Sequence, residues 1–281
     1  MNSVKTVGLL AFMTALLFWL AYSLDLGIGW AIGIAVAFNF FAYFFSDKLA
    51  LATTRAQPVT EQELPQVYSV VRRLTTATNM PMPKIYVINS PQPNAFATGR
   101  NPSKAAVAVT TGILDVLNHE ELEGVLAHEL AHVRNRDILI SSIAAMLGAA
   151  ISIVARMAFW TGRGGGSRNN PLGAIGMILS LIVAPLAAML IRFAISRTRE
   201  FQADASGAEI TGQPLHLARA LEKIAAGAER IPMRVNPATS QLFIENPLKG
   251  FRGGGAMRLF STHPPTEERI ERLTNMAMGI R

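Results

Sequence analysis

The chain has 281 residues, of which 50% are hydrophobic and only 16% charged, and its mean hydropathy is +0.30, so an ordinary soluble domain is excluded. It contains no cysteine, which excludes disulfides, thiolate nucleophiles and cysteine ligands. The net charge is +7, but neither a basic patch with interleaved aromatic residues nor a known nucleic-acid module accompanies it, so nucleic acid is not an expected partner.

Four long apolar runs are the main feature of the sequence. A helix needs about 20 apolar residues to cross a bilayer, so these runs predict a mainly α membrane protein with four transmembrane helices, paired as two hairpins. Two alternatives stay open: the first run as a cleavable signal peptide, and the last two as buried helices of a large soluble fold. The runs cover residues 7–24, 28–45, 138–160 and 172–195.

The segment between the second and third runs predicts a small α+β domain. Thr60 and Glu63 form a capping-box pattern at the start of one helix. Stretches of β-branched residues separated by turn residues predict a small sheet with one hairpin. The expected elements are a helix over 61–78, strands over 84–88, 95–98 and 105–110, and, after the fourth run, helices over 196–207 and 217–228.

Residues 128–132 read His-Glu-Leu-Ala-His, the HExxH pattern of zinc peptidases, within a predicted helix over 118–135. Two histidines four residues apart lie on one face of a helix, so His128 and His132 can bind the same ion. Glu129 lies about 100° around the helix, where it can act on a water at the metal without ligating it. The pattern predicts one catalytic Zn²⁺ per chain. Polar residues on the surface of an amphipathic helix are the alternative.

A catalytic zinc site also needs a third protein ligand. The downstream glycine and histidine of metzincins are absent, so the ligand has to come from another helix. Glu200 is the best candidate, because the third and fourth runs, if both span, return it to the membrane face of the histidines. Asp204, one turn later, can accept a hydrogen bond from a ligand imidazole. The alternative is an exposed acidic face paired with Arg197 and Arg199.

Four segments, taken in order, resemble the HtpX-type membrane zinc metalloproteases, which are related to the CAAX prenyl endopeptidases. The resemblance covers nearly the whole chain, with hydrophobic pairs in matching places. The segments are Asn-Ala-Phe-Ala-Thr-Gly at 94–99, the run from His128 to Asp137, Ser-Arg-Thr-Arg-Glu-Phe-Gln-Ala-Asp at 196–204, and Thr-His-Pro-Pro-Thr at 262–266 followed by Arg269.

The resemblance implies a gluzincin-like domain in which Glu129 is the general base. The zinc ligands that it implies are His128, His132 and Glu200. It also implies that segment 94–99 is an edge strand that pairs with an extended substrate. It suggests that His263 stabilises the transition state, although a lone histidine near a C-terminus is more often structural. The candidate substrate-strand residues are Asn94, Ala95, Phe96, Ala97 and Thr98.

The apolar runs divide the chain into two hairpins and a split catalytic domain. Lysine and arginine residues flank the first hairpin on one side, so the positive-inside rule predicts a cytoplasmic active site in a multi-pass protein of a bacterial-type plasma (inner) membrane. Arg163 and Arg168 fall on the predicted outer side, which leaves open an incomplete crossing of the second hairpin. The expected parts are 1–46 (hairpin), 47–137 (catalytic, with the HExxH helix), 138–196 (hairpin) and 197–281 (catalytic, with the third ligand).

The function that the resemblance implies is cleavage of misfolded or damaged membrane proteins, in membrane protein quality control. The expected partners are therefore unfolded or membrane protein substrates and the lipid bilayer. A CAAX prenyl endopeptidase is a related alternative, but four apolar runs are too few for its larger helical chamber. A membrane scaffold or transporter with a structural zinc is disfavoured, because cysteine ligands and acids or histidines within the spans are absent.

Overall fold

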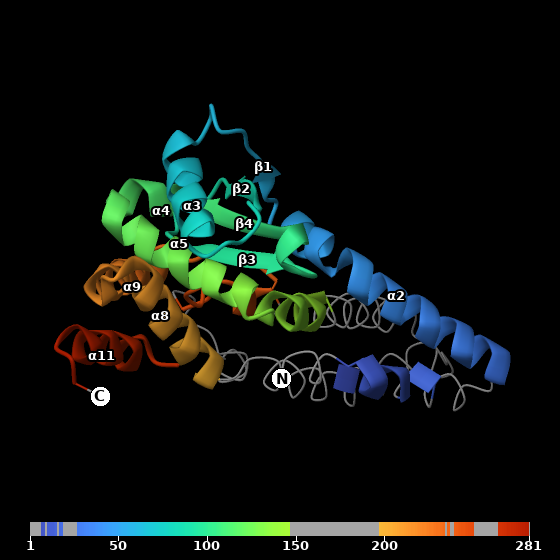
Figure 1. Cartoon of the computed structure of the whole chain (residues 1–281). Helices are drawn as coiled ribbons and strands as arrows, with labels where there is room; N and C mark the ends of the chain where they lie inside the picture. Colours follow the sequence, from blue (N-terminus) through green and yellow to red (C-terminus); the bar gives the residue numbers. More distant parts are fainter. Residues whose placement is uncertain are drawn as a thin grey trace, which may run out of the picture.

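The computed structural model describes residues 7–8, 10–15, 17–18, 27–146, 197–233, 235–236, 239–249 and 264–280. This part of the chain is mostly helical, with a small mixed sheet (Figure 1). Of the predicted apolar runs, 172–195 lies outside the described residues, as do parts of 7–24 and most of 138–160. His263 also lies outside them.

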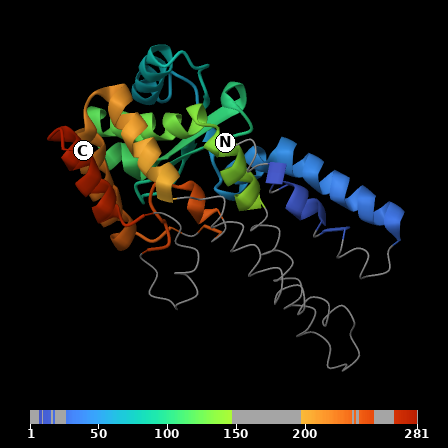
Figure 2. The same cartoon turned by 60° about the horizontal axis from the view of Figure 1, so that its bottom comes forward.

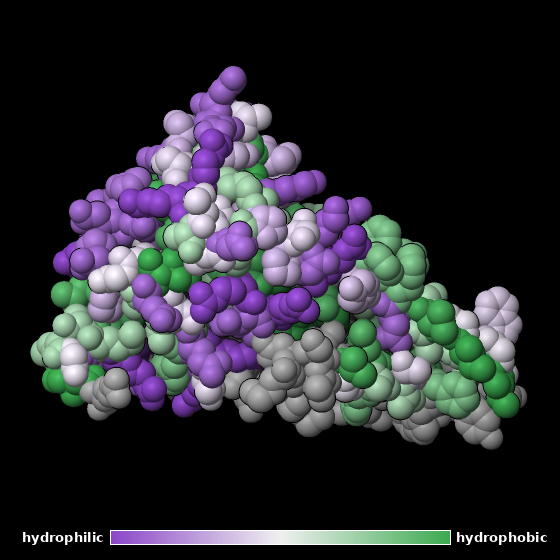
Figure 3. Space-filling model, in the orientation of Figure 1, coloured by the Kyte–Doolittle hydropathy of each residue, from purple (hydrophilic) through white to green (hydrophobic). Residues whose placement is uncertain are grey.

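Helix α2 (Ile28–Thr53) projects from the domain as a long arm (Figures 1 and 2). Large apolar side chains are exposed along it, and Trp30 at 73% and Phe41 at 55% are examples. Figure 3 shows hydrophobic residues along this arm and hydrophilic residues over much of the domain. Within the described residues it is the one helix long and apolar enough to cross a membrane, so the other three predicted spans are not established.

The C-terminal end of α2 packs against the domain. The helix continues past residue 46, the expected end of the first hairpin, and stops at Thr53. Its last turns are held there because Ala50 and Leu51 are buried in one cluster with Phe96 and other residues of the sheet. The apolar arm is therefore joined to the domain through a continuous helix.

The sheet has four strands in the order β1-β2-β4-β3. Strand β2 is parallel to β4, whereas the β1–β2 and β3–β4 pairs are antiparallel. The predicted strand and hairpin are confirmed, and Gly99 takes the positive φ of 139° that ends β3 before the turn. The bounds are β1 (Gln57–Pro58), β2 (Lys84–Ile88), β3 (Ala95–Gly99) and β4 (Ala105–Thr110), with η1 (Pro102–Lys104) in the hairpin.

Helix α3 (Pro65–Ala77) starts later than the capping pattern predicts. The carboxylate of Glu63 accepts hydrogen bonds from both N and Oγ1 of Thr60, but residues 61–63 form only a turn. The helix begins at Pro65, whose missing N–H and fixed φ suit the first helical position. The predicted start at 61 is therefore wrong.

Helix α5 (His119–Arg134) is the centre of the domain and contacts α3, β3, α8 and α9. Its predicted start is confirmed by a full capping box: Asn118 Oδ1 accepts from Glu121 N, and Glu121 Oε2 accepts from Asn118 N. The predicted downstream helices are also present. The remaining elements are α4 (Thr111–Val116), α8 (Arg197–Thr211), α9 (Pro214–Arg230), η2 (Ser240–Leu242) and α11 (Thr266–Ala277).

A short apolar helix, Asp137–Met146, follows α5 and forms the described start of the third apolar run. Its residues Ile140 and Ile143 are fully buried in a cluster with Ala42 of α2 and with Met13. This start of the run therefore packs inside the protein, against the arm.

Candidate metal centre

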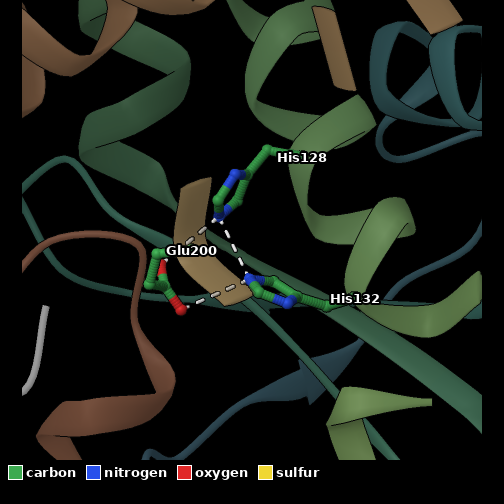
Figure 4. Close-up of side chains that lie close together, drawn as sticks. All are labelled: His128, His132 and Glu200. Carbon is green, nitrogen blue, oxygen red and sulfur yellow. Dashed lines mark hydrogen bonds and ion pairs between the residues drawn. The ribbon is translucent and has the colours of Figure 1, made fainter. Parts of the chain in front are cut away.

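Helices α5 and α8 bring the motif residues together at one point. A Cβ atom on Gly207 of α8 would lie 2.9 Å from the backbone N of His128, so the two helices approach closely only because this residue is glycine. Two turns earlier on α8, Glu200 points toward His128 and His132 of α5 (Figure 4). All three side chains are buried or nearly so.

The three side chains have the spacing of a metal site. The Nε2 atoms of His128 and His132 are 3.2 Å apart, and Glu200 oxygens lie 3.9 Å from the first and 3.6 Å from the second. Zinc binds such ligands at about 2.0–2.2 Å in a tetrahedron, which separates the ligand atoms by roughly 3.3–3.6 Å. Two imidazoles and one carboxylate, with room for a water, form the donor set of many catalytic zinc sites. The residues present fit a zinc ion.

Hydrogen bonds orient both imidazole rings. Nδ1 of His128 donates to Asp204 Oδ1 at 2.9 Å, and Nδ1 of His132 lies 3.2 Å from Asp137 Oδ2. Because an ionised carboxylate only accepts, each ring carries its hydrogen on Nδ1 and presents a lone pair at Nε2. Two facing lone pairs 3.2 Å apart repel unless a proton or a cation lies between them. The arrangement therefore favours a cation at this point.

The charges around His132 also favour a cation at this point. Burial lowers its pKa, but the hydrogen bond to Asp137 and the charges of Glu200 and Glu129 outweigh burial and raise the pKa to about 9. Burial lowers the pKa of His128 to about 4, against the opposing effect of Asp204. The acids that stabilise a proton on His132 would also stabilise a metal cation there, and His132 would then ligate it as a neutral imidazole.

Glu129 lies beside this group in an environment suited to proton transfer. Burial raises the pKa of its carboxyl to about 7; the charge of Glu200 adds to this effect, and His132 opposes it. The backbone N–H of Ala97, on β3, lies near the carboxylate and also lowers its pKa. A pKa near neutrality lets the group both accept and release a proton at physiological pH.

Arg269 was not among the predicted site residues, but in the structure it binds Asp204. Its Nη2 and Nε donate to the two oxygens of Asp204 at 2.6 and 2.8 Å, and its Nη1 donates to the carbonyl of Ile244 at 3.0 Å. Burial alone would raise the pKa of Asp204, but Arg269 holds it at about 2. Asp204 and Glu200 are 3% and 6% exposed, which rules out the exposed acidic face considered above.

Asp137 and Arg199 were also assigned no site role from the sequence. Asp137 follows the HExxH helix and bonds to His132, and Arg199 is buried beside Glu200 instead of lying on a solvated face. The HExxH spacing contains no signal for either residue. The position of Asp137 depends on how the chain turns after α5, and that of Arg199 on how α8 packs on α5.

Strand β3 lies at the edge of the described sheet and, together with Asn94 just before it, carries the expected substrate-strand residues. All five are buried: Asn94, Ala95, Phe96, Ala97 and Thr98. Chain segment 240–245 covers the first half of this edge, because Ile244 N donates to Ala95 O at 2.9 Å and Asn94 Nδ2 donates to Glu245 O at 2.9 Å. The rings of Phe96 and Phe243 pack edge to face.

Comparison with known proteins identifies the family. The model of peptidase family M48 matches residues 61–277, which include the HExxH helix, Glu200 and Arg269. The chain belongs to peptidase family M48. It is therefore a metallopeptidase. The family implies a bound metal, and His128, His132 and Glu200 form a group that could hold it.

Three relatives that are similar over almost the whole chain are each named Protease HtpX homolog. The chain is 52% identical over 286 residues to that of Persephonella marina, covering 99% of this chain and 98% of the relative. It is 50% identical over 279 residues to that of Desulfatibacillum aliphaticivorans (97% and 89%) and 50% identical over 287 residues to that of Thermococcus sibiricus (99% and 97%). The resemblance is confirmed: the chain is an HtpX-type M48 membrane metalloprotease.

Among solved structures, the crystal structure of S. mikatae Ste24p has a similar fold. The TM-score is 0.52 at 19% identity, over 97% of this chain. The chain spans 65% of the length of that protein. The likeness concerns the fold alone.

Proposed function

We propose that this M48 protein is a zinc endopeptidase in which His128, His132 and Glu200 hold one zinc ion and Glu129 is the general base. The observation that carries the proposal is that one ligand atom from each of the three residues lies within 4.8 Å of the others, beside a buried carboxyl whose pKa is raised to about 7. A structural zinc site would be closed by a fourth protein ligand instead.

When bound, zinc would supply a Lewis acid that polarises the scissile carbonyl and acidifies a water molecule. Glu129 accepts the proton of the attacking water and passes it to the leaving amine. Asp204 and Asp137 hold the two imidazoles with their lone pairs toward the centre. Arg269 keeps Asp204 ionised, because it donates to both oxygens of that carboxylate.

The substrate would bind as an extended strand along β3. The carbonyl of Ala95 already accepts from Ile244, so pairing is expected toward Ala97 and Gly99. This part of β3 adjoins Glu129, because Ala97 and Glu129 line the same cavity. A substrate that binds as an added strand is recognised through its backbone, so unfolded substrates of varied sequence can bind in this way. His263, which precedes the described Pro264, is retained as a candidate for stabilising the transition state.

The same proposal places the protein in a bacterial-type plasma membrane, with two hairpins (1–46 and 138–196) and a split catalytic domain (47–137 and 197–281) in the cytoplasm. The exposed apolar side chains of α2 support an anchored enzyme. A site beside the bilayer can reach misfolded or damaged membrane proteins, and we propose these as the physiological substrates.

The decisive experiment measures zinc content and cleavage of an unfolded protein by the full chain in detergent, for wild type, Glu129→Gln and His128→Ala. We expect about one zinc per chain in wild type and in Glu129→Gln. Cleavage by Glu129→Gln should fall by about 10²–10⁴-fold, because a general base contributes that much. His128→Ala should lose both zinc and cleavage.

Zinc in wild type without cleavage of any unfolded substrate would indicate a structural metal, and wild type without zinc would contradict the ligand assignment. The substrate class needs a separate measurement in proteoliposomes. A folded membrane protein should be cleaved more slowly than the same protein misfolded by a destabilising substitution. Equal rates would contradict the quality-control role.

A further inference from the structure

Arg199 is a buried cation with no hydrogen-bond acceptor in the described part of the protein. It precedes Glu200 on α8, and its side chain is 9% exposed. None of its nitrogens, Nε, Nη1 or Nη2, has a hydrogen-bond partner among the described residues. Asp137 Oδ1 forms an ion pair with Nη1 at 3.6 Å, which is too long for a hydrogen bond.

The contrast with Arg269 shows that this is not the usual state of a buried arginine. Arg269 is also buried, and each of its three nitrogens has a hydrogen-bond partner. Burying an N–H without an acceptor is unfavourable, and native proteins retain few such groups. The unpaired donors of Arg199 therefore need an explanation that packing alone does not supply.

The position of Arg199 indicates what its donors face. It lines the same cavity as the three candidate ligands and Glu129. The cavity volume is about 30 Å³, room for one or two atoms the size of a water oxygen but not for a substrate side chain. Segment 241–244 also lines the cavity.

The size and the lining of the cavity indicate the kind of acceptor. The carboxyl groups of Glu129, Asp137 and Glu200 already line it, and the remaining space of about 30 Å³ admits only a small group. A neutral carbonyl oxygen fits such a space and accepts a strong hydrogen bond from a guanidinium. Every peptide substrate carries such an oxygen next to its scissile bond.

We propose that Arg199 is a substrate-binding residue that donates to a main-chain carbonyl oxygen of the peptide beside the scissile bond. This inference rests on the proposed peptidase function and adds a second point of backbone recognition to that of β3. Arg199 then fixes the position of the substrate backbone relative to Glu129 and does not select among substrate side chains. It contacts the substrate directly, so its loss should weaken peptide binding and leave zinc in place.

The test compares Arg199→Gln with Arg134→Gln, a control that removes an exposed arginine from the end of α5. Both are made in a Glu129→Gln background of the full chain, so that a fluorescent unfolded peptide stays intact. Fluorescence anisotropy gives the Kd, and metal analysis gives the zinc content. We expect Arg199→Gln to weaken binding at least tenfold with unchanged zinc, Arg199→Lys to weaken it less, and the control to change Kd less than twofold.

A second measurement identifies the bonded atom. A series of peptides carries a single thioamide at successive positions, because sulfur accepts hydrogen bonds poorly. With Arg199 present, one position should lose several-fold affinity; with Arg199→Gln, the same thioamide should cause no further loss. Equal losses at every position in both proteins overturn the inference.

Two other outcomes separate the inference from the function on which it rests. Loss of zinc in both Arg199→Gln and Arg199→Lys would show that Arg199 only supports Asp137 and His132, and would overturn the inference. A protein with Glu129 intact that binds the peptide through Arg199 but never cleaves it would contradict the peptidase function and leave the binding role intact.

Discussion

Arg269 of α11 and Asp204 of α8 form a buried two-point ion pair, with Nη2–Oδ1 at 2.6 Å and Nε–Oδ2 at 2.8 Å. The same carboxylate accepts the Nδ1 hydrogen of His128 at 2.9 Å. One acid therefore links the last described helix to the helix of the metal centre. The stability of the protein and its affinity for the metal should therefore both depend on this contact.

Replacing Arg269 by Leu should lower the free energy of unfolding by about 3–5 kcal/mol, because it leaves the buried charge of Asp204 without its cationic partner. Denaturant unfolding of the detergent-solubilised protein measures the loss. Arg272→Gln is the control: it lies on the same helix, and its pair with Glu268 is exposed, so its removal should cost about 1 kcal/mol or less. Similar losses for the two variants would show that the buried pair stabilises the protein no more than the exposed pair does.

Replacing Asp137 by Asn should weaken zinc binding about 10–100-fold, because the carboxylate that orients His132 and raises its basicity is lost. Competition with a chelator of known affinity measures the change. Asp115→Asn, at an exposed position of α4, should leave the affinity unaltered. Unchanged zinc affinity in Asp137→Asn would refute the orienting role.

Gly207→Ala should disturb the metal centre through packing alone. The added Cβ would lie 2.9 Å from His128 N, so α8 has to move away from α5 and carry Glu200 with it. Gly124→Ala is a matched control, because its Cβ would lie 2.8 Å from Leu217 N, at the contact of α5 with α9. Both should cost about 1–3 kcal/mol of stability, but only Gly207→Ala should reduce zinc affinity. An equal effect of both on zinc would contradict the proposed cause.

Acid should remove part of the stability through Asp204. Its pKa is about 2 in the folded protein against an ordinary 3.8, so the unfolded chain takes up the proton first. The contribution, about 2 kcal/mol, is fully present above pH 4 and is lost as the pH falls toward 2. Unfolding free energies measured across this range should decline less steeply in Asp204→Asn than in wild type. A slope identical to that of wild type would contradict the assignment.

Local patterns in the sequence were sufficient for much of the domain. The capping pair Asn118 and Glu121 predicted the start of α5, and the turn before Ala105 predicted the hairpin, because these signals act between neighbouring residues. The pattern failed at α3, where a proline at position 65 overrode the capping signal at Thr60. Family resemblance, carried by motifs in their order, then supplied the class of enzyme.

The sequence by itself determined that the protein is apolar enough for a membrane, that His128, Glu129 and His132 share a helix, and that Glu200 is the candidate third ligand. Only the tertiary structure decided which charges are buried and how they pair. Arg269 lies 65 residues from Asp204 and 141 from His128, while the nitrogens of Arg199 have no hydrogen-bond partner among the described residues and form a long ion pair with Asp137. Such pairings depend on helix packing across long stretches of chain, where spacing in the sequence contains no information on distance in space.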